Sequence, residues 1–193
     1  MAKDRDELTA EDVEDLAHLQ SGQAEGTGAV WETVLPGEAD QRREQMELVS
    51  DTFEDGEMLP ERCAHDRDNI SPSLSWDLVP EETEELALLC QDPDAPTGTF
   101  THWVLTGIDP SITEMVEDSI PPGAVTGVND FGEVGWGGPR PPAGDPAHRY
   151  VFTLLASAVP LDLGPDATAD ELLEAIDEDL LARGELVGLY QQP

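Results

Sequence analysis

Short runs of apolar and β-branched residues, separated by turns rich in proline and glycine, make up most of the chain after position 45. The clearest runs are LALLCQ (86–91), HWVLTGI (102–108) and RYVFTLLASAV (149–159), and MELVSDTF (46–53) alternates in part. Runs of this length between turn residues predict β-strands. The intervening stretches DPDAPTG, IPPGAVTG and GWGGPRPPAGDP are predicted as loops, because proline has no amide hydrogen to donate to a helix or a sheet.

One helix is predicted near the C-terminus. Thr168 is the expected N-cap, and Glu171 stands at the capping-box position three residues later. The apolar face of this helix is expected to comprise Leu172, Leu173, Ile176, Leu180 and Leu181, with Gly184 ending it. ELVGLY (185–190) then predicts a closing strand. Many short strands with one late helix predict a mainly β fold, an antiparallel β-sandwich with one C-terminal accessory helix.

Residues 1–45 differ from the rest in holding few apolar side chains and a Gly-rich stretch at 22–28. A short amphipathic helix is expected near Val13, but a helix of about ten residues is marginal alone. We therefore predict that 1–45 is an acidic, weakly structured N-terminal extension and that 46–193 is the folded domain. The alternative is that this segment contacts a partner or a second copy in a homodimer.

The charge balance excludes several classes of partner. The 193 residues include 43 Asp plus Glu against 9 Lys plus Arg, a formal net charge of −34. Residues 46–193 hold 31 of the acidic residues and five of the basic ones, so a net charge of −26 belongs to the predicted domain. Nucleic acid and anionic membranes would repel such a surface. No apolar run approaches the roughly 18–20 residues of a membrane span.

Such acidity, with Lys3 as the one lysine, is typical of proteins from salt-accumulating halophiles. At about 1 M salt the Debye length falls to about 3 Å and the repulsion is largely screened. The first residues, MAKDRDELTAEDVEDL, lack the basic start and apolar core of a secretory signal, which predicts a cytoplasmic protein. Cys63 and Cys90 are accordingly expected as two free thiols.

Ionisable groups converge in three places: DPDAP (92–96), the pair His102 and Trp103, and GGPRPPAGDPAHRY (137–150). Asp92 and Asp94 follow a predicted strand directly. Because side chains alternate along a strand, His148 and Tyr150 are expected on one side and Arg149 on the other, where it can pair with Asp92 or Asp94.

These motifs resemble the phosphatidylethanolamine-binding protein family, in particular its prokaryotic Raf kinase inhibitor-like branch. The matching segments are NISPSLSW (69–76), DPDAP (92–96), His102 with Trp103, VTGVNDFG (125–132), GGP (137–139), PPAG (141–144) and HRY (148–150). Their order and spacing agree over roughly 46–193, and 1–45 lies outside the resemblance.

The resemblance implies a β-sandwich with an anion-binding pocket at one end, which accepts phosphate-type groups such as a phospholipid headgroup. Carried over by position, the ligand-binding residues are Asp92, His102, Pro142, His148 and Tyr150, and the structural residues at the site are Asp94, Pro96 and Arg149. No metal and no cofactor are implied. Members of this branch often have a cysteine where Arg140 stands here, which leaves Cys63 without that partner.

The residue chemistry suits such a pocket. A histidine beside an anion gains protonation, and Tyr150 supplies a hydroxyl donor. Ionised Asp92 cannot donate to a phosphate oxygen, so it is expected to orient His102 or His148, or to accept from an amine. Arg140 and Arg149 are the cations of this acidic domain that fall in the pocket segment.

The leading prediction is a non-catalytic binding protein for a small phosphate-type anion. The first alternative is a protein-interaction regulator, because relatives of the family inhibit kinases and proteases. The second alternative is a hydrolase or phosphatase built on Asp92, His102 and His148 with Ser71 or Ser73. It is disfavoured because no G-x-S-x-G elbow is present and a Lys or Arg clamp is hardly available.

Overall fold

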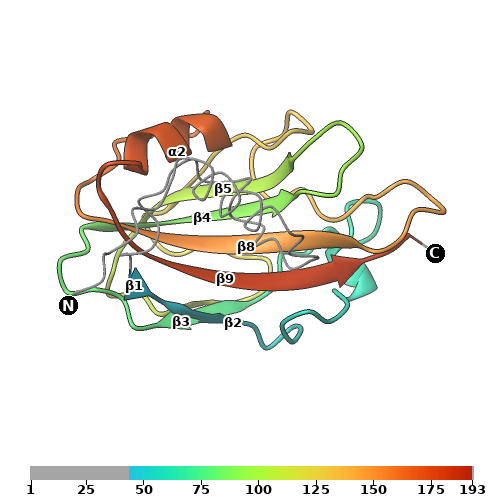
Figure 1. Ribbon diagram of the computed structural model, residues 1–193, viewed down its shortest axis with the longest axis horizontal. Coiled ribbons are helices and arrows are strands. Elements are labelled where there is room, and N and C mark those ends of the chain that lie inside the picture. The colour runs from blue at the N-terminus through green and yellow to red at the C-terminus, as the bar shows by residue number, and fades with distance from the viewer. Residues whose placement is uncertain (1–43, 193) are drawn as a thin grey trace, which may run out of the picture.

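Two β-sheets pack face to face in this computed structural model, which describes residues 44–192 (Figure 1). The larger sheet has six strands in the order β1-β9-β8-β4-β5-β7, and the smaller has three in the order β2-β3-β6. The larger sheet comprises β1 (Glu44–Gln45), β9 (Leu180–Tyr190), β8 (His148–Ser157), β4 (Glu85–Asp92), β5 (Phe100–Ile108) and β7 (Val125–Thr126). The smaller comprises β2 (Glu47–Val49), β3 (Leu74–Asp77) and β6 (Glu114–Met115). All pairs are antiparallel except β1 with β9, which confirms the predicted sandwich.

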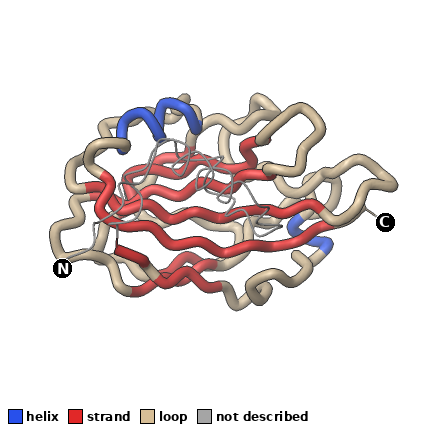
Figure 2. The backbone as a smooth tube through the Cα atoms, viewed as in Figure 1, coloured by secondary structure: helices blue, strands red, loops and turns tan. Residues whose placement is uncertain are grey.

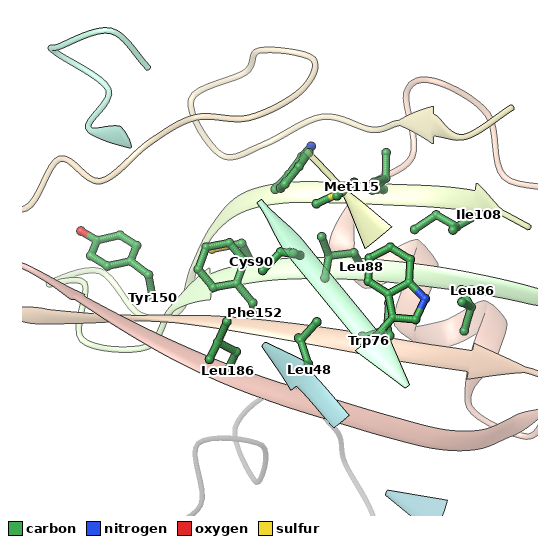
Figure 3. Close-up of a cluster of buried hydrophobic side chains, with 14 of the residues drawn as sticks. Leu48, Trp76, Leu86, Leu88, Cys90, Ile108, Met115, Tyr150, Phe152 and Leu186 are labelled. Atoms are coloured by element: carbon green, nitrogen blue, oxygen red, sulfur yellow. The ribbon is translucent and has the colours of Figure 1, made fainter. Parts of the chain in front are cut away.

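The main core lies between the two sheets. Alternate residues of β4, such as Leu86, Leu88 and Cys90, belong to this core together with Trp76 of β3, and all four are nearly or fully buried (Figure 3). Burial of this much apolar surface is the dominant favourable contribution to folding. The central strands β4, β5 and β8 are therefore held rigidly along their length, up to the ends where the polar motifs begin.

Helix α2 (Ala169–Ile176) covers the outer face of the larger sheet, over β4 and β5 (Figure 1). Leu172 and Ile176 are fully buried in a second apolar cluster that includes Leu89 of β4 and Val104 of β5. The predicted capping box is present, because Thr168 Oγ1 accepts from the Glu171 amide and Glu171 Oε2 accepts from the Thr168 amide.

The predicted end of this helix is wrong. The helix stops at Ile176, and β9 begins at Leu180, so Leu180, Leu181 and Gly184 belong to a strand. Over 180–190 every second residue is buried, which is the two-residue period of a strand. This strand pairs with β8 along the whole length of β8. Gly184 is needed for close packing rather than for a cap, because a Cβ there would lie 2.9 Å from the carbonyl oxygen of Met46.

The other predicted strands are present in β2, β4, β5 and β8, and ELVGLY is the second half of β9. Long irregular segments connect them (Figure 2). Of the predicted N-terminal extension, only Glu44 and Gln45 are described, as β1, and the rest lies outside the described residues. Within residues 44–192, no helix is long and apolar enough to cross a membrane.

Candidate functional site

A cavity of about 200 Å³ opens where β4 ends and β8 begins. Six of the eight predicted site residues line it together with aromatic, proline and arginine side chains: Asp92, Ala95, Pro96, Thr97, Phe100, His102, Phe131, Arg140, Pro141, Pro142, His148 and Tyr150. Asp94 and Arg149 lie outside the lining. A larger groove of about 710 Å³ runs beside α2, but it contains none of the predicted site residues. We therefore consider the smaller cavity the candidate site.

A β-bulge in β5 turns His102 into this cavity. Cys90 of β4 pairs with Trp103 and Gln91 pairs with Thr101, so His102 is an extra residue in β5. Bulges re-aim a side chain in this way. The ring of His102 consequently lies 5.0 Å from the ring of Tyr150, which belongs to β8 on the other side of β4.

Asp92 and His148 form a buried pair at the floor of the site. His148 Nδ1 lies 2.7 Å from Asp92 Oδ2, and the two residues are 4% and 3% exposed. The other carboxylate oxygen, Oδ1, accepts from the backbone amide of Asp94 at 2.8 Å. Of the roles left open for Asp92, the structure shows that it orients His148 rather than His102. A carboxylate so buried is tolerable only because both oxygens are partnered.

Asp94 and Arg149 form a second pair, outside the cavity. Arg149 donates Nε–H and Nη2–H to the two carboxylate oxygens of Asp94, at 2.9 and 2.7 Å. The hydrogen bonds from Arg149 lower the pKa of Asp94, and burial offsets only part of this effect. The pair ties the DPDAP loop to the start of β8. The positive charge of Arg149 is thereby neutralised.

His102 is held by the GGP segment. Its Nδ1 lies 2.6 Å from the carbonyl oxygen of Gly137. Burial lowers the pKa of His102 to about 4, and the carbonyl of Gly137 offsets only part of this. His102 is therefore neutral at pH 7 in the protein without a ligand.

Close packing explains the two glycines of this segment. A Cβ on Gly137 would lie 2.6 Å from the ring of Phe131, and one on Gly138 would collide with the carbonyl oxygen of Cys63. The amide of Gly138 donates to Asn69 Oδ1 at 2.8 Å. Both cysteines are buried and unbonded, as predicted for free thiols.

The hydroxyl of Tyr150 is an unpartnered polar group at the cavity. Tyr150 is fully buried, and its oxygen has no hydrogen-bond partner among residues 44–192. Figure 3 shows this hydroxyl at the end of the apolar cluster, pointing away from Phe152 and Cys90. Burial, followed by the charge of Asp92, raises the pKa of Tyr150. The backbone amide of Arg140 lowers this pKa slightly, but it does not reach hydrogen-bond geometry. The Tyr150 O–H is therefore free to donate to another group.

Arg140 is the cation at the mouth of the cavity. Its side chain is exposed, and it has no ion-pair partner within the described part of the chain. By contrast, Arg62 and Arg149 lie 2.6 and 2.7 Å from carboxylate oxygens. An unpaired arginine on a surface this acidic is a local exception to the field of the whole protein.

Two aromatic residues at the site were not predicted individually. Phe100 and Phe131 pack against each other at 4.7 Å and against His102 at 4.9 and 5.6 Å. They form an apolar wall that excludes water from one side of the imidazole. Phe131 lies in the VTGVNDFG motif, which was the signal in the sequence that could have placed it at the site. Phe100 belongs to none of the matching motifs.

The chain is a two-sheet β-sandwich whose small end pocket contains a buried acid–histidine pair. The family model described as phosphatidylethanolamine-binding protein matches residues 49–191. The chain belongs to that family, as its motifs had indicated.

Individual relatives agree with this assignment. The UPF0098 protein of Methanothermobacter thermautotrophicus is 44% identical over 152 residues, which span 76% of this chain and 99% of that one. The solved phosphatidylethanolamine-binding protein homologue CT736 of Chlamydia trachomatis is 35% identical, with a TM-score of 0.72 over 78% of this chain and 99% of that chain. A Mycobacterium tuberculosis relative, LppC, is 36% identical over 77% of this chain and 73% of its own length, and its name marks it as a candidate lipoprotein.

Proposed function

We propose that this protein is a non-catalytic binding protein whose end pocket takes a small phosphate-type anion. The observation that supports the proposal most strongly is the buried Tyr150 hydroxyl, which lines the cavity and lacks a partner among the described residues. A buried donor left unsatisfied costs about 1–3 kcal/mol, and a ligand oxygen would remove that cost. Arg140 at the mouth adds the charge that an anion requires.

The dimensions of the cavity favour a small group. Ligand pockets for drug-sized molecules are about 300–1,000 Å³, whereas this one is about 200 Å³. The prolines at 96, 141 and 142 stiffen its rim. A phosphate-sized group suits such a pocket better than a bulky molecule, and any lipid tail would remain outside.

The absence of catalysis is part of the proposal. Among the described residues that line the cavity there is no serine or cysteine to act as a nucleophile, and Thr97 makes no hydrogen bond to His102 or His148 that would activate its hydroxyl. Asp92 already accepts from His148 and from the Asp94 amide, so it is committed to holding the site together. The hydrolase or phosphatase alternative predicts turnover of a generic phosphate ester that disappears in Asp92→Asn.

Calorimetric titration tests this function. Phosphate, phosphoethanolamine and acetate are added in about 2–3 M KCl, where surface repulsion is screened, to the wild type, Tyr150→Phe and Tyr190→Phe. We expect saturable binding of phosphate that falls about tenfold in Tyr150→Phe, the equivalent of one lost hydrogen bond. Tyr190 is a matched control because it is also buried but does not line the cavity. Binding by none of the three anions would reject the function.

The alternative of a protein-interaction regulator has one supporting observation. Val116 and Val134 are 65% and 61% exposed. They stand two and one positions from Asp118 and Gly135, which line a recess of about 350 Å³. Exposed apolar groups of this kind occur at protein interfaces. A kinase or protease partner, or a homodimer, predicts that Val116→Ser weakens the association without altering phosphate binding.

A cytoplasmic location in a salt-accumulating cell is also proposed. It is supported by two buried free thiols and by the acidic surface of the folded domain. Fractionation of the native organism tests it, and recovery with the membrane fraction, as a lipoprotein would show, would contradict it.

A further inference from the structure

The pocket offers hydrogen-bond acceptors as well as donors. A carbonyl oxygen can only accept, so the 2.6 Å contact with Gly137 assigns the hydrogen of His102 to Nδ1. A neutral imidazole has a single N–H, which leaves Nε2 with a lone pair. The phenyl rings of Phe100 and Phe131 keep the imidazole in an apolar environment that opposes a second proton. His102 therefore contributes an acceptor to the cavity that it lines.

Asp92 adds further acceptor capacity. Its carboxylate oxygens each receive one hydrogen bond, and a carboxylate has about four lone-pair positions in total. The donors of the same cavity include the Tyr150 hydroxyl, the Thr97 hydroxyl and the Arg140 guanidinium. The pocket thus combines donors with acceptors within about 200 Å³. An oxyanion that has only lone pairs would satisfy the donors and repel the acceptors.

We propose that the pocket selects an oxyanion that carries its own proton, with His102 Nε2 accepting the P–OH and Tyr150 donating to a P–O⁻. Hydrogen phosphate and the singly protonated form of a phosphate monoester have this group, whereas sulfate esters and phosphate diesters at neutral pH do not. The inference rests on the proposed anion pocket and narrows its ligand class to the free phosphate or the monoester. An intact phospholipid headgroup is a diester and is disfavoured.

The discrimination comes from an unpaired acceptor. Sites built to hydrogen-bond a ligand O–H reject analogues that lack it by large factors, because a buried group is then left without a partner. Here an oxyanion without a proton would place an oxygen lone pair against the lone pair of His102 Nε2. We expect at least about a tenfold preference for the proton-bearing ligand.

Matched ligands test the proposal at about pH 6, where a phosphate monoester is about half singly protonated. Methyl phosphate and methyl sulfate are then similar in shape, and the singly protonated phosphate has the same charge as the sulfate but differs in the one O–H. Dimethyl phosphate represents the lipid-type diester. In calorimetry on the full chain at fixed KCl, methyl phosphate should bind at least about tenfold more tightly than the other two. Equal affinity for methyl sulfate would overturn the proposal and leave the anion pocket intact. Binding of none of the three rejects the pocket itself and the selection with it.

Two variants locate the selectivity. His102→Asn places an amide nitrogen near the position of Nδ1, which keeps the donor to Gly137 and removes Nε2. The preference for methyl phosphate over methyl sulfate should then disappear, because the P–OH loses its acceptor and the sulfate is no longer repelled by the Nε2 lone pair. Arg140→Gln should weaken both ligands by the same factor, because its charge does not distinguish them. A folded His102→Asn protein that keeps the preference contradicts the role of His102. If that variant does not fold, the wild-type comparison still decides the selection.

Discussion

Asp92 and Asp94 stand two residues apart in one loop, yet they belong to different environments. Asp92 is 3% exposed and holds His148 inside the cavity, whereas Asp94 is about one-third exposed and holds Arg149 outside it. Both carboxylates fasten the end of β4 to the start of β8. The difference shows that one D-P-D motif supplies a buried residue of the candidate site and an exposed loop clasp.

Removal of the buried member should have the largest effect. Asp92→Ala removes the carboxylate that lies 2.7 Å from Nδ1 of the buried His148, and breaking a buried pair costs about 3–5 kcal/mol. We expect a loss of this size in the free energy of unfolding, measured by denaturant titration in about 2 M KCl. A loss below about 1 kcal/mol, the range of exposed pairs, would show that burial does not separate the two carboxylates.

The pH dependence of folding stability tests the buried environment of His102. Its pKa is lowered to about 4 in the folded chain, against about 6.5 in an unfolded chain. Between these values only the unfolded state binds the proton, so stability is complete above about pH 6.5 and falls as the pH drops towards 4. The loss amounts to about 3 kcal/mol. Chemical denaturation from pH 7 to 4 measures it, and His102→Asn should show a flatter profile over the same range.

The exposed clasp should contribute less. Asp94→Asn removes the charge from the bidentate contact, and exposed pairs are worth about 0.2–1 kcal/mol. Since the pKa of Asp94 is lowered in the folded state, its contribution is present above the usual carboxyl pKa and disappears as the pH falls through the folded value. We expect phosphate affinity within about twofold of the wild type. A tenfold loss would mean that the clasp also shapes the pocket.

The smallest effect on stability is expected at Arg140. Its side chain is exposed and unpaired among the described residues, so Arg140→Gln should change the free energy of unfolding by less than about 0.5 kcal/mol. Phosphate affinity should nevertheless fall about tenfold, because a charged hydrogen bond is lost. Arg62→Gln is the matched control, since Arg62 pairs with Glu117 away from the cavity.

The sequence predicted the strands and the residues at their ends well. Apolar runs marked β4, β5 and β8, and alternation placed His148 and Tyr150 together with Arg149 opposite. These features are local, and local periodicity is what a single sequence expresses directly. The helix boundary failed because Leu180 and Leu181 fit a helical face as well as a strand. Only the pairing of β9 with β8, which requires distant residues, decides between them.

Three features of the candidate site could not be read from the sequence. The bulge that turns His102 inward arises from the register between β4 and β5. The neutrality of His102 results from burial beside Phe100 and Phe131, which lie 2 and 29 positions away. The missing partner of the Tyr150 hydroxyl is known only once every neighbouring group is placed. Each is a property of the assembled end of the sheet rather than of any one segment.

The location of the cavity at the strand ends has a consequence for local opening. Asp92, His102 and Tyr150 come from three adjacent strands, so a bound ligand would bridge β4, β5 and β8 near the ends of their ladders. Amide hydrogen exchange at strand ends reports such fraying separately from global unfolding. Occupancy of the pocket should therefore slow exchange at these termini while leaving the fully buried middle of the sheet unchanged, so that the edge of the sheet itself becomes a reporter of the ligand.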